Sequence, residues 1–494
     1  MNNKNCLRKV YRESLALLTD LYELTMAYGY WKKGMADKDA VFHLFFRRRP
    51  FNGSFAIAAG LATVLDYLDD FRFQTDDLAY LETLRTDDGK LLFEKKFLDF
   101  LSSFSFSLDI DAIPEGTPVF PHEPLVRVQG KILHAQLLEG VLLNIINFQT
   151  LIATKAARIC WAARPDPVVE FGLRRAQGID GALSASRAAF IGGCESTSNV
   201  LAGKIFGIPV KGTHAHSWIM AFDDEEESFD AYAEAMPNNC VFLIDTYDTV
   251  EGVKKAINVA RRMRKKGIEM IGVRLDSGDL AHLSIAIRKI LDEAGFPKAQ
   301  IMASNELDEL IINDLKHQGA KVTIWGVGTH LITGKDQPAL DGVYKLSAVK
   351  DCKGKWQDKV KISEQLVKVT NPGVLQVRRY FDEQGNIADM IYDIRSTLSE
   401  APQIIDSLDP SRQQKIFASM QYKDLLVPVM RKGKRVYEDP TLPQIREKTF
   451  LELSQFHPGM RRFLYPQPYL VGLEHSLNDL KLQLIQEIKN KQVL

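Results

Sequence analysis

The middle of the chain is organised by short apolar segments that end in Gly-, Ser-, Thr- or Asp-rich loops. Several of them are followed by the 3.6-residue hydrophobic spacing of a helix, most clearly over residues 250–266, 280–294 and 306–317. Strands that alternate with helices predict a parallel α/β sheet. The predicted strands are residues 168–171, 189–191, 210–212, 241–244, 270–273, 301–303 and 322–325.

Seven such strands favour a barrel over an open sheet, because polar residues follow nearly every strand and a barrel gathers those loops into one site. We therefore predict an irregular parallel α/β barrel, similar to a TIM barrel, over residues 151–375. Residues 1–150 mix helical and extended patterns, with a helix expected over 14–32 and a strand over 40–46. They predict a separate α+β domain.

Composition and charge narrow the class of protein. The 494 residues include 63 Lys+Arg and 63 Asp+Glu, and a net charge of zero argues against a dedicated nucleic-acid binder. Five widely spaced cysteines without a C-x-x-C pair exclude zinc-ribbon spacing and make a secreted disulfide framework improbable. Asp20 and Glu23 interrupt the N-terminal apolar run, and the apolar stretch 133–153 contains six polar residues. We therefore expect a cytoplasmic protein with neither signal peptide nor membrane span.

Polar residues at two predicted strand ends are suited to phosphate chemistry. Arg274 and Asp276 follow the strand 270–273, and the alternation of side chains along an extended chain places both on the same side. There they can hold a phosphate-bearing substrate and a metal ion or ribose hydroxyl. Gly328 and Thr329 follow the last strand, where backbone N–H groups and a hydroxyl can approach a phosphate. Residues 151–220 also carry eight basic and four acidic residues, which predicts a locally basic pocket.

His214 and His216 alternate in another polar segment, and three interpretations of the pair are open. They can be metal ligands, structural histidines with satisfied hydrogen bonds, or a nucleophilic or acid–base group, because imidazole titrates near neutrality and can carry a phosphoryl group. A metal-dependent barrel hydrolase would need further ligands at other strand ends. Most of the remaining histidines lie in predicted helices or outside the barrel.

Phe171 and Arg174 follow the first predicted strand of the barrel. An aromatic ring beside an arginine suits a flat anionic ligand, stacked by the ring and bound by the guanidinium. Standing alone, the pair would be interpreted as a core phenylalanine with a surface arginine. Tyr22 in the first helix is most simply an aromatic residue at the edge of a core.

In this order, the motifs resemble those of the nicotinate phosphoribosyltransferase family, along nearly the whole chain. The matching stretches are 18–26, 49–61, 170–178, 212–217, 274–279, 328–329 and 342–346. Any one of them is weak evidence, but seven in the family's order are specific.

The resemblance implies an enzyme that transfers the ribose phosphate of phosphoribosyl pyrophosphate (PRPP) to nicotinate. The products are nicotinate mononucleotide and pyrophosphate, in the first step of NAD synthesis from nicotinate. ATP hydrolysis is coupled to this transfer in the family through a phosphorylated histidine. That residue corresponds to His216, because the family pattern is Gly-Thr-x-x-His.

The resemblance also implies the remaining site residues and partners. Nicotinate would lie against Phe171, with Tyr22 of a second subunit on its other face, so the enzyme would be a homodimer with shared active sites. Mg²⁺ would be the metal, with Asp276 as its ligand, and residues 376–494 would pack back on the N-terminal domain. The resemblance places Thr213 and Arg274 around the base, and Arg174, Asp276, Gly328 and Thr329 around the ribose and phosphates, with His216, Arg274 and Asp276 as the catalytic residues.

The choice of substrate and the type of chemistry are each open to a different interpretation. Ser196 and Ser198 offer hydroxyls that suit a carboxylate, but Glu195 beside them leaves a nicotinamide-using phosphoribosyltransferase open. A metal-dependent barrel hydrolase would use His214 and His216 as metal ligands. A catalytically silent relative would bind nucleotide-like ligands without turning them over.

Overall fold

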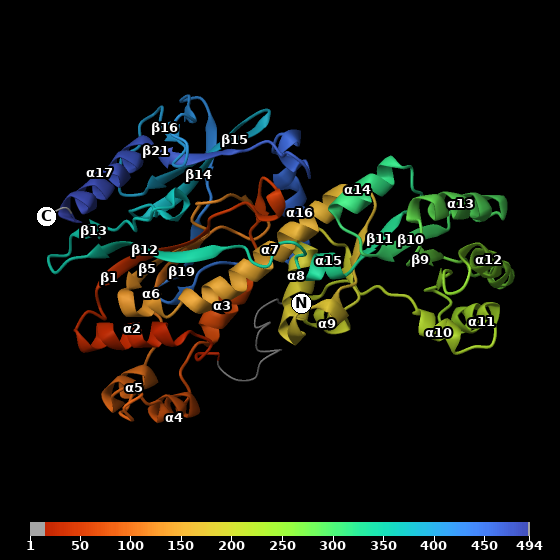
Figure 1. The fold of residues 1–494 in the computed structure, drawn as a ribbon, viewed down its shortest axis with the longest axis horizontal. Coiled ribbons are helices and arrows are strands. Elements are labelled where there is room, and N and C mark those ends of the chain that lie inside the picture. The colour runs from red at the N-terminus through yellow and green to blue at the C-terminus, as the bar shows by residue number, and fades with distance from the viewer. Residues whose placement is uncertain (1–14, 493–494) are drawn as a thin grey trace. The chain divides into compact units, whose positions relative to one another are not determined.

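The computed structural model describes residues 15–492, and these form two compact units. Among the described residues, the first unit contains those up to Leu151 and those from Ala339 onward, and the second contains Ile152–Pro338. Helix α7 (Glu139–Ala163) belongs partly to each. Figure 1 shows the elements in chain order.

The first unit is built on a mostly antiparallel sheet with the order β13-β12-β1-β5-β3-β19-β20. The sheet combines strands that are far apart in the sequence, because β1 pairs with β5 on one side and with β12 on the other. Its strands are β1 (Asp39–Phe46), β3 (Asp109–Ala112), β5 (Val126–Lys131), β12 (Gly342–Lys350), β13 (Trp356–Asp358), β19 (Val427–Arg431) and β20 (Lys434–Arg435).

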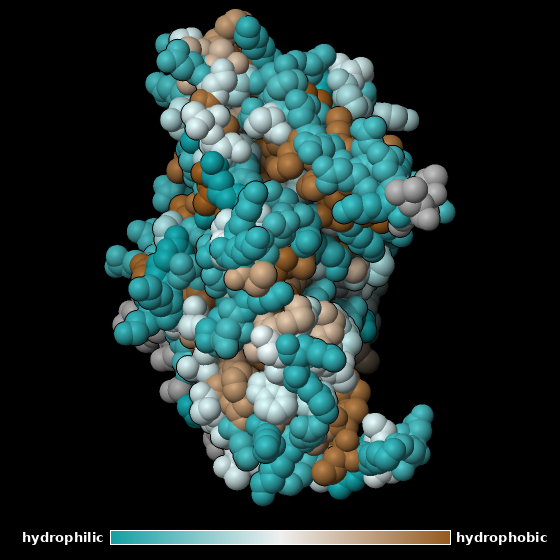
Figure 2. All heavy atoms as spheres, turned by 90° about the vertical axis from the view of Figure 1, so that its left-hand side faces the viewer, coloured by the Kyte–Doolittle hydropathy of each residue, from teal (hydrophilic) through white to brown (hydrophobic). Residues whose placement is uncertain are grey.

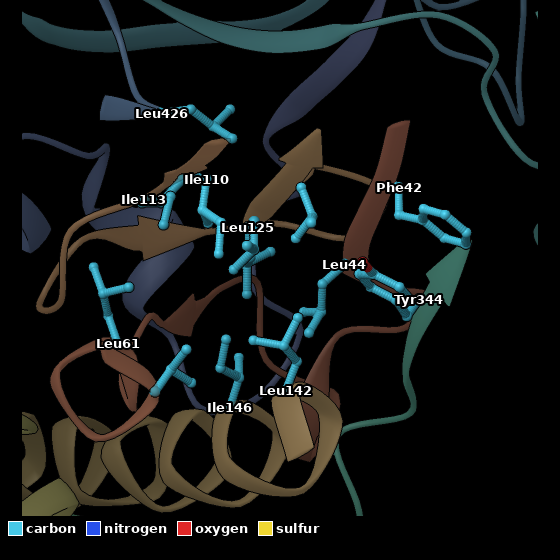
Figure 3. Packing of buried hydrophobic residues seen from close by; sticks show 14 of the residues in the cluster. Phe42, Leu44, Leu61, Ile110, Ile113, Leu125, Leu142, Ile146, Tyr344 and Leu426 are labelled. Carbon is cyan, nitrogen blue, oxygen red and sulfur yellow. The ribbon is translucent and has the colours of Figure 1, made fainter. Parts of the chain in front are cut away.

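Alternate residues of β1 face a large apolar core, which Figure 3 shows from close by. Phe42 stacks on Tyr344 of β12, with ring centroids 4.9 Å apart and an interplanar angle of 7°. Leu142 and Ile146, on the N-terminal half of α7, cover the same face of the sheet, together with helix α3 (Leu61–Asp70). The strand predicted over 40–46 is thereby confirmed, and its alternation of large apolar side chains explains why it is central.

A second, smaller core joins the N-terminal helices α2 (Leu21–Lys32), α4 (Thr75–Thr83) and α5 (Lys95–Ser102). Helix α2 begins later than the predicted 14–32, because Asp20 and Glu23 form a capping box that fixes its first turn. Residue 14 lies outside the described residues. The short elements nearby are η1 (Pro50–Asn52), β2 (Ala56–Ile57), β4 (Pro118–Val119) and α6 (Ile132–Gln136).

The C-terminal part of the first unit forms a second sheet with the order β17-β16-β21-β15-β14-β18. Its strands are β14 (Leu375–Asp382), β15 (Gly385–Asp393), β16 (Gln403–Ile405), β17 (Gln413–Lys415), β18 (Gln421–Asp424) and β21 (Leu470–Glu474). The segments around it are η3 (Leu366–Lys368), α16 (Leu442–Ser454), η4 (Pro458–Arg461) and α17 (His475–Gln492).

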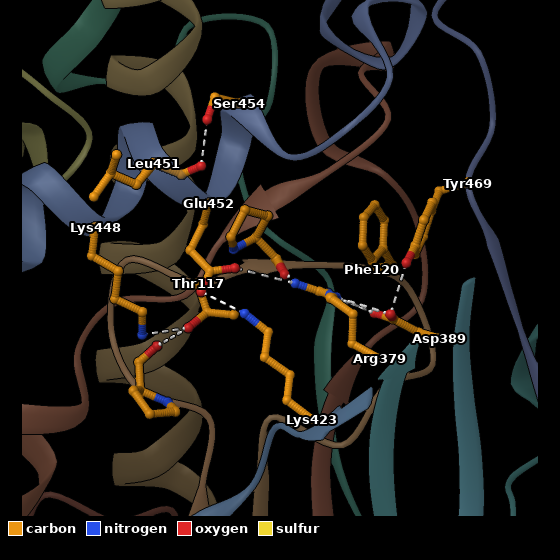
Figure 4. A network of polar contacts seen from close by, with 12 residues as sticks. Thr117, Phe120, Arg379, Asp389, Lys423, Lys448, Leu451, Glu452, Ser454 and Tyr469 are labelled. Atoms are coloured by element: carbon orange, nitrogen blue, oxygen red, sulfur yellow. Dashed lines mark hydrogen bonds and ion pairs between the residues drawn. The ribbon is translucent and has the colours of Figure 1, made fainter. Parts of the chain in front are cut away.

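A buried ion pair joins β14 and β15, two neighbouring strands of this sheet (Figure 4). The side chains of Arg379 on β14 and Asp389 on β15 are both fully buried, with Arg379 Nε 2.9 Å from Asp389 Oδ1. Arg379 also donates to the carbonyl of Pro118 at 2.9 Å, and the hydroxyl of Tyr469 donates to Asp389 Oδ1 at 2.9 Å. Burial, together with the neighbouring Asp389, raises the pKa of Glu123 well above its usual value. Arg379 therefore provides the positive charge for a buried cluster that contains the carboxyl groups of Asp389 and Glu123.

The second unit contains a six-stranded parallel sheet with the order β7-β6-β11-β10-β9-β8. The strands are β6 (Val168–Glu170), β7 (Ser196–Thr197), β8 (Val241–Leu243), β9 (Gly272–Leu275), β10 (Gln300–Asn305) and β11 (Ile324–Val327). The connecting helices are η2 (Leu173–Arg175), α8 (Gly178–Ile191), α9 (Val200–Phe206), α10 (His216–Met220), α11 (Glu225–Ala235), α12 (Thr249–Lys265), α13 (Leu280–Glu293), α14 (Glu309–His317) and α15 (Thr329–Ile332).

The predicted closed barrel is wrong, although the parallel α/β class is right. The first strand β6 pairs with the last strand β11, which is the cyclic order of a barrel, but within the described residues β7 and β8 do not pair. Residues 189–191, predicted as a strand, are the last turn of α8, since their apolar run continues the buried face of that helix. Residues 210–212 contribute only a single bridge, from Val210 to Thr197. The sheet therefore lacks the strands that would close it.

One described helical stretch, Ile132–Ala163, is long and apolar enough by length and composition to cross a membrane. In the structure, 61% of its most apolar window is buried inside the protein. The face drawn in Figure 2 is mainly hydrophilic, with small groups of apolar side chains between polar ones.

Replacing Arg379 with methionine should strongly destabilise the first unit. The change would leave the buried carboxylate of Asp389 without its cation, and breaking a buried ion pair in this way costs about 3–5 kcal/mol. Urea unfolding followed by fluorescence would measure the loss. The matched control is Arg412→Met, which breaks the more exposed pair with Asp406 and should cost about 1 kcal/mol or less. Equal effects of the two changes would contradict this account.

Candidate active site

A cavity of about 430 Å³ lies at the carboxyl ends of the parallel strands of the second unit. Parallel strands point the same way, so the residues that follow them meet at one edge of the sheet. Eight of the residues predicted to bind substrates or act in catalysis line this cavity, namely Phe171, Arg174, Ser198, Thr213, Arg274, Asp276, Gly328 and Thr329. His214, Ser304, Asn305, Glu306 and Gly326 line it as well. The structure thus brings together residues that are up to 158 positions apart, from Phe171 to Thr329.

Three predicted residues are placed differently. Ser196 on β7 is 1% exposed and does not line the cavity, whereas Ser198 does, because β7 ends at Thr197 and the alternation of a strand does not extend to Ser198. Tyr22 lies on α2 of the first unit and is 45% exposed. His216 is not a lining residue, but its Nε2 atom lies 3.7 Å from Oδ2 of the lining residue Asp276.

The ring of Phe171 forms one wall of the cavity and lies directly over Gly326 on β11. A Cβ atom at Gly326 would come within 2.8 Å of two carbon atoms of the ring, so only glycine leaves room for it there. The amide of Phe171 donates to the carbonyl of Val327 at 2.8 Å, which continues the pairing of β6 with β11 beyond the strand. The backbone therefore fixes the position of this ring.

Below this wall lies Glu170, a fully buried carboxylate that was not predicted from the sequence. Its Oε2 atom accepts hydrogen bonds from Ser186 Oγ at 2.9 Å and from Thr197 Oγ1 at 2.6 Å, and Oε1 accepts one from the amide of Gly172. The carbonyl of Glu170 accepts from the amide of Ser198 at 2.9 Å. Glu170 thus holds together the turns after β6 and β7 that carry Phe171 and Ser198. An acidic residue at the end of an apolar strand was the signal for it.

Arg274, on β9, supplies a partly buried positive charge. Burial lowers the pKa of its guanidinium, while the nearby carboxylates of Asp276 and Asp245 act in the opposite direction. One terminal nitrogen, Nη2, donates to the carbonyl of His214 at 3.3 Å. Its Nε atom is buried and makes no hydrogen bond to the described residues. Such a group is suited to binding an anion inside the cavity.

Asp276 is held by two neighbouring strand ends. Its amide donates to Oδ2 of Asp245, which follows β8, at 2.8 Å, and Ser277 Oγ donates to the same oxygen at 2.7 Å. Ser304 on β10 donates to Oδ1 of Asp276. Asp245 was not predicted as a site residue from the sequence, in which it is only a polar residue after an apolar strand. Its Oδ1 atom is buried and has no hydrogen-bond partner among the described residues.

The two histidines have different surroundings. His216 begins α10, and its Nδ1 atom lies 3.0 Å from Oγ1 of Thr246. His214 is buried, packs against the ring of Tyr232 and accepts a hydrogen bond from the amide of Leu243 at its Nε2 atom. Burial lowers the pKa of His214 to about 4, although the adjacent backbone of Ala215 opposes this shift. Among residues 15–492, no group of three or more His, Cys, Asp or Glu side chains is arranged to hold a metal ion by itself.

Glu195, which left the choice of substrate open, does not line the cavity. Its carboxylate is partly exposed and lies 3.3 Å from Nζ of Lys211. The cavity lining contains three arginines, Arg174, Arg175 and Arg274, and two carboxylates, Asp276 and Glu306. The excess of cations agrees with the basic pocket predicted from residues 151–220.

Comparison with known proteins places the chain in a family. Three family models match it: the nicotinate phosphoribosyltransferase N-terminal domain over residues 17–147, the nicotinate phosphoribosyltransferase family over 167–383, and the C-terminal domain over 375–481. The chain belongs to the nicotinate phosphoribosyltransferase family. The nicotinate phosphoribosyltransferase of Bacillus subtilis is 42% identical over 484 residues, which cover 97% of each chain. The human enzyme of that name is 34% identical, over 94% of this chain and 95% of its own length.

Solved structures agree with this assignment. The crystal structure of human nicotinic acid phosphoribosyltransferase matches with a TM-score of 0.82 at 32% identity, covering 94% of this chain and 99% of that one. The structure of nicotinate-nucleotide pyrophosphorylase from Pyrococcus furiosus has a TM-score of 0.69 at 23% identity, covering 90% of this chain and 96% of that one, and it shares the fold.

His214 should remain neutral in the folded protein until the pH is well below its ordinary pKa of 6.5. Because the folded state then binds fewer protons than the unfolded state between pH 6.5 and about 4, this histidine should lower the stability of the fold as the pH falls through that range. Nitrogen NMR of histidine-labelled protein would measure the titration, and His214→Gln would assign the signal. A titration near 6.5 would contradict the prediction.

Proposed function

We propose that the protein is a nicotinate phosphoribosyltransferase, which condenses nicotinate with PRPP to give nicotinate mononucleotide and pyrophosphate. The observation that carries the proposal is that seven residues implied by the resemblance, together with Ser198, meet in one cavity. The family match along nearly the whole chain supports the same reaction. As part of the proposal, the reaction takes place in the cytoplasm.

The charges of the cavity suit this reaction. Breaking the bond between ribose and pyrophosphate creates an oxocarbenium-like centre and concentrates negative charge on the leaving group. We assign Arg174, Gly328 and Thr329 to the ribose and the phosphates, where guanidinium, backbone N–H and hydroxyl groups donate hydrogen bonds. Arg274 and Thr213 are assigned to the base, beside the wall formed by Phe171. The ring nitrogen of nicotinate then attacks the anomeric carbon as pyrophosphate leaves.

We assign the coupling of the reaction to ATP hydrolysis to His216. The imidazole accepts the γ-phosphoryl group of ATP and ADP leaves, and water later removes the phosphoryl group as inorganic phosphate. A phosphohistidine beside Asp276 adds negative charge at the edge of the cavity, where its phosphoryl group can contact the cationic lining. The hydroxyl of Thr246 holds the ring of His216 in place for this step.

Mg²⁺ fits the acidic side of the cavity when it is shared with a diphosphate substrate. Asp245 has a buried, unpartnered carboxylate oxygen among the described residues, and Asp276 presents a half-exposed carboxylate in the cavity. Mg²⁺ is commonly held by one or two carboxylates together with phosphate oxygens and water. Asp276 and Asp245 would hold it, and the ion would neutralise charge on the leaving pyrophosphate.

A homodimer completes the proposed site. Tyr22 is a large, half-exposed aromatic residue on α2, next to the exposed apolar side chains of Leu21 and Met26. A partner subunit's α2 would place Tyr22 on the face of nicotinate opposite Phe171. Tyr22 is then a residue that one subunit supplies to the other.

The assay that tests the function measures formation of nicotinate mononucleotide from nicotinate and PRPP, with and without ATP and Mg²⁺. We expect turnover that ATP stimulates, and a ³²P-labelled phosphoenzyme that forms with γ-labelled ATP. His216→Ala should abolish the phosphoenzyme and the stimulation by ATP, because alanine offers no nitrogen to phosphorylate. The control His282→Ala changes an exposed histidine outside the cavity and should preserve both. Full coupling in His216→Ala would overturn the role of His216.

Ser198→Asp should shift the preference from nicotinate towards nicotinamide. Of the two serines predicted to face the substrate, only Ser198 lines the cavity, and a carboxylate there would repel nicotinate and accept a hydrogen bond from an amide. We expect kcat/KM for nicotinate to fall by about 10- to 100-fold, the range given by one charged hydrogen bond. Competition between the two bases measures the ratio, with Ser196→Asn at the buried position outside the lining as a comparison. An unchanged ratio in Ser198→Asp would exclude this residue as a determinant of specificity.

A further inference from the structure

The backbone fixes the tautomer of His214. The amide N–H of Leu243 on β8 points at Nε2 of the ring, 3.3 Å away. A backbone amide can only donate a hydrogen bond, so Nε2 must accept and carries no proton. In the neutral ring, the proton is therefore on Nδ1. This arrangement also removes Nδ1 as a metal ligand, because a protonated nitrogen has no free lone pair.

The proton on Nδ1 has no well-aligned acceptor within the described part of the chain, although the adjacent backbone of Ala215 favours the protonated ring. The Nδ1 atom is buried and makes no hydrogen bond there, although His214 lines the cavity. A buried donor without a partner is costly, and most such groups in proteins are satisfied by protein, water or ligand. The fold thus leaves a buried N–H donor on a residue of the cavity lining.

The neighbouring residue Arg274 offers a second donor without a hydrogen-bond partner among the described residues. Arg274 donates from Nη2 to the carbonyl of His214 itself, so the two residues are neighbours, and its buried Nε atom is also without a partner among residues 15–492. Both residues line the same cavity. A cationic donor and a neutral donor side by side are suited to an oxyanion, because one supplies charge and the other directs a hydrogen bond.

We propose that His214 is a substrate-binding residue that donates its Nδ1–H to an oxyanion of the substrate, next to Arg274. The inference rests on the proposed function, whose two substrates both carry such a group: the carboxylate of nicotinate and the phosphates of PRPP. His214 therefore has a role separate from that of His216. The ring of His214 stays neutral and binds substrate, whereas the ring of His216 accepts a phosphoryl group.

Two substitutions at this position separate binding from folding. Glutamine places its amide near the Nε2 position of histidine, so His214→Gln keeps an acceptor for Leu243 N–H but loses the donor to the cavity. Asparagine places its amide near the Nδ1 position, so His214→Asn keeps that donor but leaves Leu243 N–H without its acceptor. The two variants therefore remove the two hydrogen bonds of the ring one at a time.

His43 offers a matched control in the first unit. It is buried, its Nε2 accepts from the amide of Leu375 at 3.1 Å, and its Nδ1 is likewise unpartnered among described residues, but it is not a lining residue of the cavity. His43→Gln makes the same chemical change away from the cavity. It should leave the KM values of both substrates unchanged.

Steady-state kinetics on the purified full-length enzyme, together with thermal unfolding, tests the proposal. We expect His214→Gln to raise KM for one substrate by about 10- to 100-fold, with an unfolding midpoint near that of the wild type. His214→Asn should keep KM within about threefold and lower the midpoint, because a backbone donor loses its partner. A rise confined to nicotinate assigns the oxyanion to the carboxylate, and a rise confined to PRPP assigns it to a phosphate.

The proposal is overturned if His214→Gln binds both substrates like the wild type, or if His214→Asn loses as much affinity as His214→Gln. Failure of the proposed function looks different, since the wild-type protein would then form no nicotinate mononucleotide from the two substrates.

Discussion

The site depends on one constraint, the parallel direction of the strands in the second unit. Because β6, β9, β10 and β11 all run the same way, the polar residues that follow them meet at one edge. Pairing of the first strand β6 with the last strand β11 brings Phe171 next to Gly326 and Gly328. Without that long-range pairing, neither the aromatic wall nor the glycine-rich turn would belong to the same cavity.

Buried polar groups then fix what the sheet brings together. Glu170 connects the turns after β6 and β7, and Asp245, which follows β8, connects to the end of β9 that carries Asp276 and Ser277. These carboxylates orient their neighbours through hydrogen bonds from backbone and hydroxyl donors. In the first unit, the ion pair between Arg379 and Asp389 holds strands β14 and β15 of a sheet together. Arg274 Nε and His214 Nδ1, two buried groups without a hydrogen bond among the described residues, belong to residues that line the cavity, where a substrate can supply the partner.

His214 and His216 show which features of the site local sequence can predict and which it cannot. Alternation in an extended segment predicts that His214 and His216 face the same way, and this would suit a pair of metal ligands. In the structure the extended segment ends between them, since Ala215 is the N-cap of α10. His214 therefore turns to the amide of Leu243, while His216 turns to Thr246. Where a helix begins decides their roles, and both partners come from the polypeptide around β8.

The sequence by itself determined the α/β class of the second unit, most of its strands and helices, and the residues that follow the strands, because hydrophobic periodicity and loop chemistry are local properties. It also determined the family, since seven motifs in order leave little freedom. It could not decide whether the sheet closes, because that depends on pairing between β7 and β8, and residues 189–191 are as apolar in a helix as in a strand. Nor could it separate Ser196 from Ser198, or find Asp245 and Glu170. Where a short strand ends beside the cavity, and which carboxylate is buried beneath it, are settled only when distant segments pack together.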